Sequence, residues 1–509
     1  MSLDRDREPT GHSGLSLGRR AGWLTLGRIS HTAALLLVGA ILSRALSPAE
    51  YGQYQQAWVY LNIAIPLFLF GMPVSLSYFL APAKGPARDR RAAQHVLLIL
   101  LFAALFTLCV GSLWMAASVF AIPAEVRALM PAGILIGAGM IACGFLEPVL
   151  IIYGRHRVLT GSLLLFAALH LTAVLAGWFF GESLEWIFTC LGGSVVLRVV
   201  WSYLLLFRLL RPLSLDLVRQ PLEDPLKYAW RVGLRDGIEV LSRFVDKLIF
   251  LSFFTTSQFA FYHNGAWEIP VVIFVHSMLA VLLPELRVAC SRGDMGEVLN
   301  LMHFAARRVA LVLFPAAAFA FSVAPELTSF LFGEDYRDSG AYLRVFLLLL
   351  PLRVSTAGLV LLAANRTRAV LLGTGVDLVL AAVLGVALVP WLGTLAPAAA
   401  LVVSTFCQVG FYNWRTSTLI GRPLPEILPW PALGRLALPS AAAALGAAFC
   451  ARFESALLNL MTAGTVFALL LCGLGLSLRL FDARERVLLG EAARSAAARC
   501  RSVLVSRGD

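Results

Sequence analysis

The sequence predicts an all-α polytopic membrane protein. Apolar residues make up 59% of the chain and charged residues only 14%, against roughly 45–50% and 25% in an ordinary soluble domain. Runs of about twenty apolar residues, the length that crosses the hydrocarbon core as a helix, recur along the chain. Lys and Arg fall mainly in alternate connections between these runs, as expected where cytoplasmic loops carry the positive charge.

These apolar runs predict about fourteen transmembrane helices. The even connections and both tails hold most of the Lys and Arg, whereas the odd connections hold little beyond Arg44, Arg127, Arg337 and Arg452. We therefore expect both termini in the cytoplasm. The net charge of +12 suits anionic lipid headgroups and does not require nucleic acid. The runs lie at 22–43, 53–80, 95–121, 128–154, 158–181, 184–210, 229–253, 258–286, 304–332, 339–364, 367–391, 394–419, 433–452 and 456–480.

An internal repeat predicts two parallel six-helix lobes followed by a C-terminal helix pair. At an offset near 210, LSRALSPAEYGQY (42–54) matches LSFFTTSQFAFY (251–262), and GRHRV (154–158) matches NRTRA (365–369). Similar order and orientation are typical of transporters whose lobes rock about a central substrate path. The predicted division is an N-terminal tail at 1–21, an N-lobe at 22–210, a linker at 211–228, a C-lobe at 229–420, two additional helices at 433–480 and a C-terminal tail at 481–509.

The connections leave no room for a catalytic domain, since none exceeds about twenty residues. The chain contains no GxxxxGK[ST] loop, no HExxH and no His/Cys cluster with metal-ligand spacing. We therefore expect no enzymatic activity, no cofactor and no metal site. The eight histidines are scattered, and we expect structural roles for them. The outward connection GEDYRDSG (333–340) reads as a polar turn in preference to a paired-carboxylate site.

The seventh run differs from the others because it carries eight charges between Lys227 and Lys247. On a helix, the charges from Arg231 to Lys247 fall within an arc of about 160°, and Leu and Val occupy the opposite side. A charged face at membrane depth must contact protein or a water-filled space. The i,i+4 spacing of Glu239 with Arg235 and Arg243 also predicts an ion pair within this helix.

Further ionisable residues lie inside other runs, and two interpretations of them remain open. In one, the cations bind a phosphate-bearing substrate, a task suited to guanidinium groups. In the other, they form buried pairs with nearby acids. Arg198 and Arg353 lack a carboxylate one helical turn away on their own helix, which favours them as substrate ligands. The predicted lumen cations are Arg28, Arg198, Arg235, Arg243, Lys247 and Arg353, and the candidate ion-coupling acids are Glu147, Glu268 and Asp377.

The stretch ILSRALSPAEYGQYQQAW (41–58) resembles the first-helix signature of polysaccharide transporters, with Ser47-Pro48 in place of Gly-Pro. DKLIFLSFFTTSQFAFYHNGAWEIP (246–270) and LFGEDYRDSGAYLRV (331–345) resemble the corresponding parts of the second lobe, and the likeness spans nearly the whole chain. This family belongs to the multidrug, oligosaccharidyl-lipid and polysaccharide exporter superfamily. The resemblance also makes aromatic side chains candidate sugar contacts, with an interfacial belt as the alternative: Trp58, Tyr60, Tyr262, His263 and Trp267.

The resemblance implies a flippase of the bacterial inner membrane. Its expected substrate is an undecaprenyl-pyrophosphate-linked oligosaccharide repeat unit of O-antigen, capsule or exopolysaccharide. Membrane lipids and other glycan-assembly proteins are its expected partners. A lipid II flippase and a drug/cation antiporter of the same superfamily are the alternatives, followed by a membrane glycan polymerase or ligase, which would need a larger outward loop.

Overall fold

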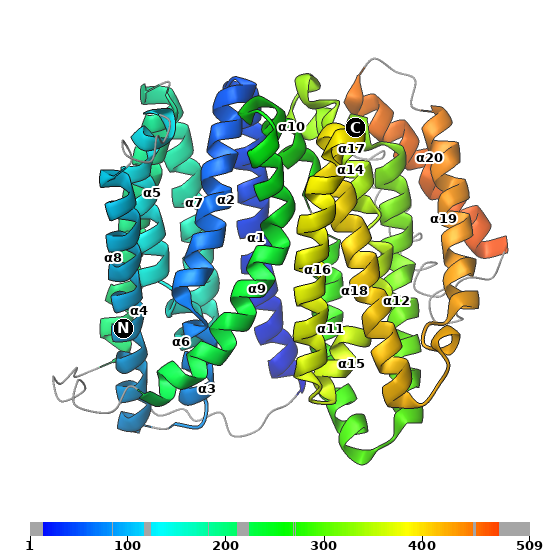
Figure 1. The fold of residues 1–509 in the computed structure, drawn as a ribbon, viewed down its shortest axis with the longest axis horizontal. Coiled ribbons are helices and arrows are strands. Elements are labelled where there is room, and N and C mark those ends of the chain that lie inside the picture. Colours follow the sequence, from blue (N-terminus) through cyan, green and yellow to red (C-terminus); the bar gives the residue numbers. More distant parts are fainter. Residues whose placement is uncertain are drawn as a thin grey trace, which may run out of the picture. The chain divides into compact units, whose positions relative to one another are not determined.

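The computed structural model describes residues 14–83, 85–116, 124–181, 183–210, 223–267, 269, 271–450 and 455–477. These residues form helices joined by short turns, and no strand occurs among them (Figure 1). By their contacts they divide into two compact units, Met1–Phe261 and Tyr262–Asp509. The predicted all-α class is confirmed.

Each predicted apolar run coincides with a helix or with a helix broken by a short turn. The helices of the N-terminal unit are α1 (Gly14–Ala45), α2 (Pro48–Leu69), α3 (Met72–Leu80), α4 (Gly85–Met115), α5 (Ala124–Ala142), α6 (Leu146–Ile152), α7 (His156–Gly181), α8 (Leu184–Leu209), α9 (Glu223–Phe253) and the first part of α10 (Thr256–Gly265).

The C-terminal unit contains the remaining helices and a 3₁₀ turn, η3 (Pro351–Val354). Its helices are α11 (Val272–Arg292), α12 (Met295–Ser322), α13 (Ala324–Phe332), α14 (Ser339–Leu347), α15 (Ala357–Ala363), α16 (Thr367–Ala387), α17 (Val389–Leu392), α18 (Ala396–Ile420), α19 (Trp430–Cys450) and α20 (Ala456–Ser477).

Among the described residues, ten helices or helix pairs are long and apolar enough to cross a membrane. An eleventh qualifies when Ser339–Val354 and Ala357–Ala363, which meet at a bend of 46°, are counted as one span. Helix α9 is not among them, and its many charges account for this. The chain is therefore a multi-pass membrane protein, and the count of fourteen spans stays a prediction.

The repeat is visible in the hydrogen bonds that end two helices. Gly154 after α6 and Asn365 after α15 both have positive φ, at 68° and 58°. The following residue donates in each case to the carbonyl five residues back, Arg155 to Leu150 and Arg366 to Leu361, both at 2.8 Å. This is the Schellman arrangement, which needs a left-handed residue and therefore favours Gly or Asn. The sequence match at 154–158 and 365–369 thus reflects one geometry used twice.

The other repeat match also has a structural counterpart. Ser47 caps α2, and its side chain and backbone exchange hydrogen bonds with Glu50. Thr255 precedes α10 and exchanges the same two hydrogen bonds with Gln258. Both are capping boxes, which satisfy two otherwise free N–H groups at a helix start. This reciprocal cap begins the second helix of each predicted repeat.

Helix α9 packs against α2 and α3, so the contacts group it with the N-terminal unit. The predicted C-lobe begins at residue 229, whereas the compact units divide after Phe261. Close approach explains this grouping, since a Cβ at Gly233 would lie 2.8 Å from the carbonyl carbon of Phe70. The last two helices, α19 and α20, pack against α12 and α13 of the C-terminal unit.

Replacing Gly233 with Ala should lower the thermal stability of the detergent-solubilised protein. The added methyl group meets backbone that cannot move freely, and overpacking of this kind costs about 1–3 kcal/mol. Gly111→Ala on α4 is the matched control, because a Cβ there meets no atom within 4 Å. Melting temperatures of the three proteins provide the measurement. Equal melting of both variants would show that α9 does not depend on this contact.

Candidate functional site

The middle of α9 carries a row of charges one helical turn apart, and these side chains are about half exposed or more. We call Arg235, Glu239 and Arg243 the α9 ladder. Glu239 lies between Arg243 at 3.1 Å and Arg235 at 3.7 Å, each one helical turn away. The side chains are 48%, 65% and 49% exposed for Glu239, Arg243 and Arg235. The predicted pairing within the helix is therefore confirmed. Asp236 interacts with Arg235 and Glu239 as well, so the cations and the acids of this face are close to balanced.

In the C-terminal part of α9 the charged side chains are buried. Lys247 donates to the Asp246 carboxylate at 3.2 Å, and both residues are buried. The Lys247 ammonium also lies 5.6 Å from the centre of the Phe244 ring. A buried ammonium requires such partners because its desolvation is costly. Of the charges predicted on α9, Arg235 and Arg243 remain the more accessible cations.

Arg198 lies fourteen residues into α8, about 21 Å from the start of that helix at 1.5 Å per residue. The face of its guanidinium lies 4.5 Å from the centre of the Phe166 ring on α7. Its Nε atom is inaccessible to solvent and has no hydrogen-bond acceptor. The aromatic ring therefore satisfies the face of the group, while part of its edge remains available for an acceptor.

Two histidines surround Arg198 in the packed helices of the N-terminal unit. His31 on α1 interacts electrostatically with Arg198, and His170 on α7 interacts with both. The Nδ1 atom of His31 and the Nε2 atom of His170 are buried and lack hydrogen-bond partners. The Trp58 ring from α2 lies 5.6 Å from the ring of His170. We call His31, Trp58, His170 and Arg198 the N-unit polar cluster.

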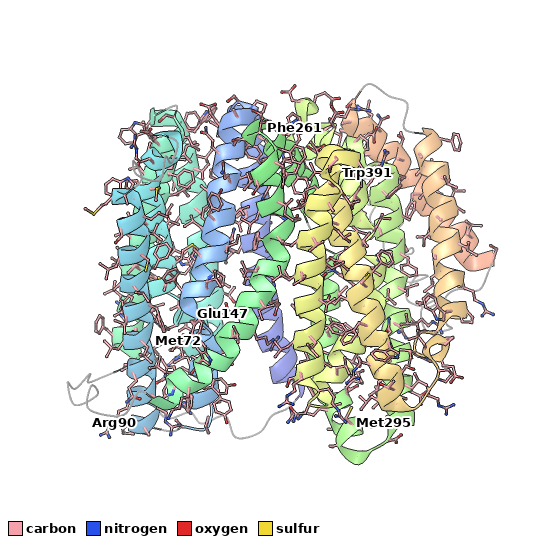
Figure 2. The ribbon with its side chains drawn as sticks, in the orientation of Figure 1. Met72, Arg90, Glu147, Phe261, Met295 and Trp391 are labelled. Atoms are coloured by element: carbon pink, nitrogen blue, oxygen red, sulfur yellow. The ribbon has the colours of Figure 1, made fainter. Side chains whose placement is uncertain are left out.

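Two residues near the break between α5 and α6 complete the surroundings of Arg198. The Cys143 thiol lies within hydrogen-bonding reach of Arg198, and the Glu147 carboxylate interacts with it electrostatically. Figure 2 shows Glu147 in the N-terminal unit, nearer the end that carries Arg90 than the end that carries Phe261. Structure thus brings together Arg198 and Glu147, a predicted lumen cation and a predicted ion-coupling acid.

Predicted site residues of the C-terminal unit have separate surroundings. Arg353 lies in η3, at the bend between α14 and α15. Asp377 on α16 is buried and accepts a hydrogen bond of 2.8 Å from Ser404 on α18. Glu268 lies outside the described residues, as does the side chain of Arg28.

The outward connection at 333–340 is a turn stabilised by ion pairs. Arg337 donates to Glu334 at 3.1 Å and to the largely buried Glu326 at 3.0 Å. Hydrogen bonds from Ser329 and Arg337 lower the pKa of Glu334. The interpretation of this segment as a polar turn is confirmed, because Glu334–Tyr336 form a 3₁₀ turn and Glu334 is engaged in local contacts.

Sequence reasoning did not place His31, His170 and Cys143 beside Arg198. The expectation of structural roles for the histidines rested on their wide separation in sequence. A usable signal did exist, since both His31 and His170 lie well inside apolar helices where ionisable groups are rare. The contact of α1 with α7 and of α7 with α8 brings them to Arg198. No group of His, Cys, Asp or Glu suited to a metal ion occurs within the part of the chain that the structure describes.

Known proteins resemble this chain in part of its sequence and in its fold. A family described as "Polysaccharide biosynthesis protein" matches residues 158–341. Sequence comparison with curated proteins finds no match. The fold is similar to an inward closed conformation of the lipid II flippase MurJ, with a TM-score of 0.69 at 12% identity over 89% of this chain and 99% of that chain.

Other similar folds are also transporters. An inward-facing multidrug resistance MATE family transporter of the MOP superfamily has a TM-score of 0.66 at 16% identity, over 77% of this chain and 94% of that one. A MOP superfamily transporter from Pyrococcus furiosus, described as having a binding pocket of reverse polarity, has a TM-score of 0.59 at 16% identity, over 79% and 95%. The match to a polysaccharide biosynthesis family agrees with the resemblance predicted from the sequence, and the similar structures show that the chain shares the fold of these transporters.

The α9 ladder should contact water in the membrane-embedded protein. With the eight native cysteines replaced, Arg243→Cys should react with a charged thiol reagent at least about tenfold faster than Leu234→Cys, because only a hydrated thiol ionises readily. Leu234 is also exposed, at 55%, but lies on the apolar side. Ser242→Cys provides a buried control. Similar rates at positions 234 and 243 in permeabilised cells would exclude a water-filled space beside α9.

Proposed function

We propose that this chain, a polysaccharide transporter of the multidrug, oligosaccharidyl-lipid and polysaccharide exporter superfamily, flips undecaprenyl-pyrophosphate-linked oligosaccharide repeat units. The headgroup moves from the cytoplasmic to the periplasmic leaflet of the bacterial inner membrane, with both termini of the chain in the cytoplasm. The family match over residues 158–341 and the MurJ-like fold support this proposal. Alternating access between the two sides of the membrane is the mechanism that the superfamily fold suits.

The observation that carries the proposal is the state of Arg198. A guanidinium at mid-membrane costs at least about 2.5–3.5 kcal/mol to insert. The protein covers its face with Phe166 but leaves the Nε–H group without an acceptor. A phosphate oxygen would supply that acceptor, and hydrogen bonds to charged groups contribute about 1.5–3 kcal/mol each. Arg198 is accordingly the proposed ligand for the diphosphate.

The α9 ladder has a complementary role in this proposal. In this proposal α9 lies beside a water-filled space. There the exposed side chains of Arg235 and Arg243 attract the diphosphate and its sugars, while the prenyl chain remains in lipid. Arg28, Lys247 and Arg353 remain proposed lumen cations. Glu147, Glu268 and Asp377 remain proposed ion-coupling acids, and Ser404 donates a hydrogen bond to Asp377.

A lipid II flippase is the second candidate function. It is favoured by the similarity to MurJ, which covers 99% of that chain, and its substrate would present the same diphosphate to Arg198. A drug/cation antiporter is the third candidate, and the similarity of the fold to a multidrug resistance MATE family transporter favours it. Accumulation of lipid-linked repeat units in a deletion strain, with normal peptidoglycan synthesis, would separate the first function from the second.

Arg198→Ala should reduce export about ten- to a hundredfold, which corresponds to losing one or two charge-assisted hydrogen bonds. The measurement is surface glycan in a deletion strain that expresses each variant at equal level, together with the amount of repeat unit trapped on the cytoplasmic leaflet. Arg198→Lys should recover only part of the activity because it keeps the charge but not the planar fork.

Arg208→Ala is the matched control, since Arg208 lies on the same helix and is exposed near its end. It should support export close to that of the unsubstituted chain. Equal export by the position 198 and 208 variants would remove Arg198 from the site. Normal surface glycan in the deletion strain, with no redundant transporter, would remove the flippase function itself.

A further inference from the structure

Three nitrogen atoms in the N-unit polar cluster lack hydrogen-bond partners. They are Nε of Arg198, Nδ1 of His31 and Nε2 of His170, and all three are inaccessible to solvent. Leaving a buried polar atom unsatisfied costs about 1–3 kcal/mol, so three in one cluster carry a considerable penalty. They come from α8, α1 and α7, and α7 packs against both of the other helices. Such an arrangement is typical of a site completed by a ligand.

The charges that face the cluster narrow the class of ligand. Arg198 interacts with both histidines and, on its other side, with Cys143 and Glu147. Trp58 packs against His170, and Tyr54 packs against Trp58. Glu147 is the one carboxylate with a described interaction to Arg198. A cluster that offers a guanidinium and two imidazoles suits an anion rich in oxygen acceptors, namely a phosphate or diphosphate.

We propose that the N-unit polar cluster binds the diphosphate of the lipid-linked substrate together with a proton, which is held by His31 or His170. This inference rests on the proposed function and identifies two residues and a proton linkage that the function alone does not require. An imidazolium beside a guanidinium is unfavourable, whereas an anion placed between them attracts both. Anion and proton therefore bind cooperatively, and each increases the affinity for the other.

Charge balance explains why a proton binds together with the anion. A diphosphate that is esterified at both ends carries two negative charges at neutral pH, and the Glu147 carboxylate, which interacts with Arg198, adds a third. Arg198 and one protonated histidine supply two positive charges, so the proton brings the occupied site closer to neutral. A site that is closer to neutral costs less in the low dielectric of the membrane. His31 and His170 interact with each other, so the proton on one disfavours a proton on the other.

Calorimetric titration of the purified full-length protein tests this inference. The probe is a short-chain prenyl diphosphate linked to N-acetylglucosamine, because its phosphates do not titrate near neutral pH. Affinity should fall as pH rises from about 6 to 8, by up to about tenfold per unit if one proton is linked. Titrations in buffers with different ionisation enthalpies should show uptake of about one proton.

The double variant His31→Gln/His170→Gln should bind the probe more weakly and without pH dependence. His303→Gln is the control, since His303 lies in the C-terminal unit and bonds the backbone carbonyl of Glu426. It should retain both affinity and proton uptake. Melting temperatures show whether each variant is folded. Binding of the probe by the unsubstituted protein without proton uptake, or pH dependence that persists in the double variant, overturns the inference.

Two further ligands distinguish the source of the anion. Inorganic pyrophosphate tests for a free-phosphate site, and nanodiscs of phosphatidylglycerol test for a lipid-headgroup site. Either one binding more tightly than the prenyl diphosphate overturns the assignment to the transported lipid. The two proposals fail separately: probe binding without a linked proton leaves the Arg198 export defect intact, whereas normal glycan export in the deletion strain rejects the flippase function.

Discussion

The cost of placing a charge at membrane depth governs the arrangement of this protein. The ionisable side chains inside the helices have different kinds of surroundings. Lys247 is buried against Asp246, and Asp377 accepts a hydrogen bond from Ser404. Glu239 bridges two arginines on the exposed face of α9. Arg198 differs from these because its environment satisfies it only in part. An incomplete environment at this depth has no structural advantage, which makes function the better explanation of it.

The same low dielectric acts on the backbone, since broken helices expose carbonyl and N–H groups that lipid cannot satisfy. Side chains of a neighbouring helix contact the backbone beside such a break in both units. Tyr203 of α8 donates to the carbonyl of Ala142 at the break before α6, and Thr416 of α18 donates to the carbonyl of Ala357 at the start of α15. These breaks place Cys143 and Glu147 of the N-terminal unit beside non-helical backbone. They do the same for Arg353 of the C-terminal unit. Polar chemistry and helix breaks thus occur together because both need the same kind of protected surroundings.

Features set by local sequence could be predicted, whereas features set by helix rotation could not. The apolar runs, the i,i+4 pairing of Glu239 and the matched connections at 154–158 and 365–369 all depend on residues near one another in the chain. The N-unit polar cluster depends on which faces of α1, α7 and α8 meet, and apolar helices give little periodic signal of their facing. Helix α9 illustrates the limit well. Its predicted charged arc includes both Arg243 and Asp246, yet the first is exposed and the second is buried, because neighbours change along the length of the helix.

Glu147 gives the proposed site a means of selection. Its carboxylate interacts with Arg198 and offsets part of the charge of that residue. A ligand that binds Arg198 must therefore compete with this carboxylate. A singly charged phospholipid headgroup brings no more charge than Glu147 does and must also be desolvated. A diphosphate brings two charges and enough oxygens to reach Arg198 and a histidine together, and only such a ligand recruits the additional proton. Glu147 carries less negative charge than the diphosphate and about as much as a phospholipid headgroup. The diphosphate can therefore displace Glu147 from Arg198 whereas a phospholipid cannot, although phospholipids are far more abundant in the membrane.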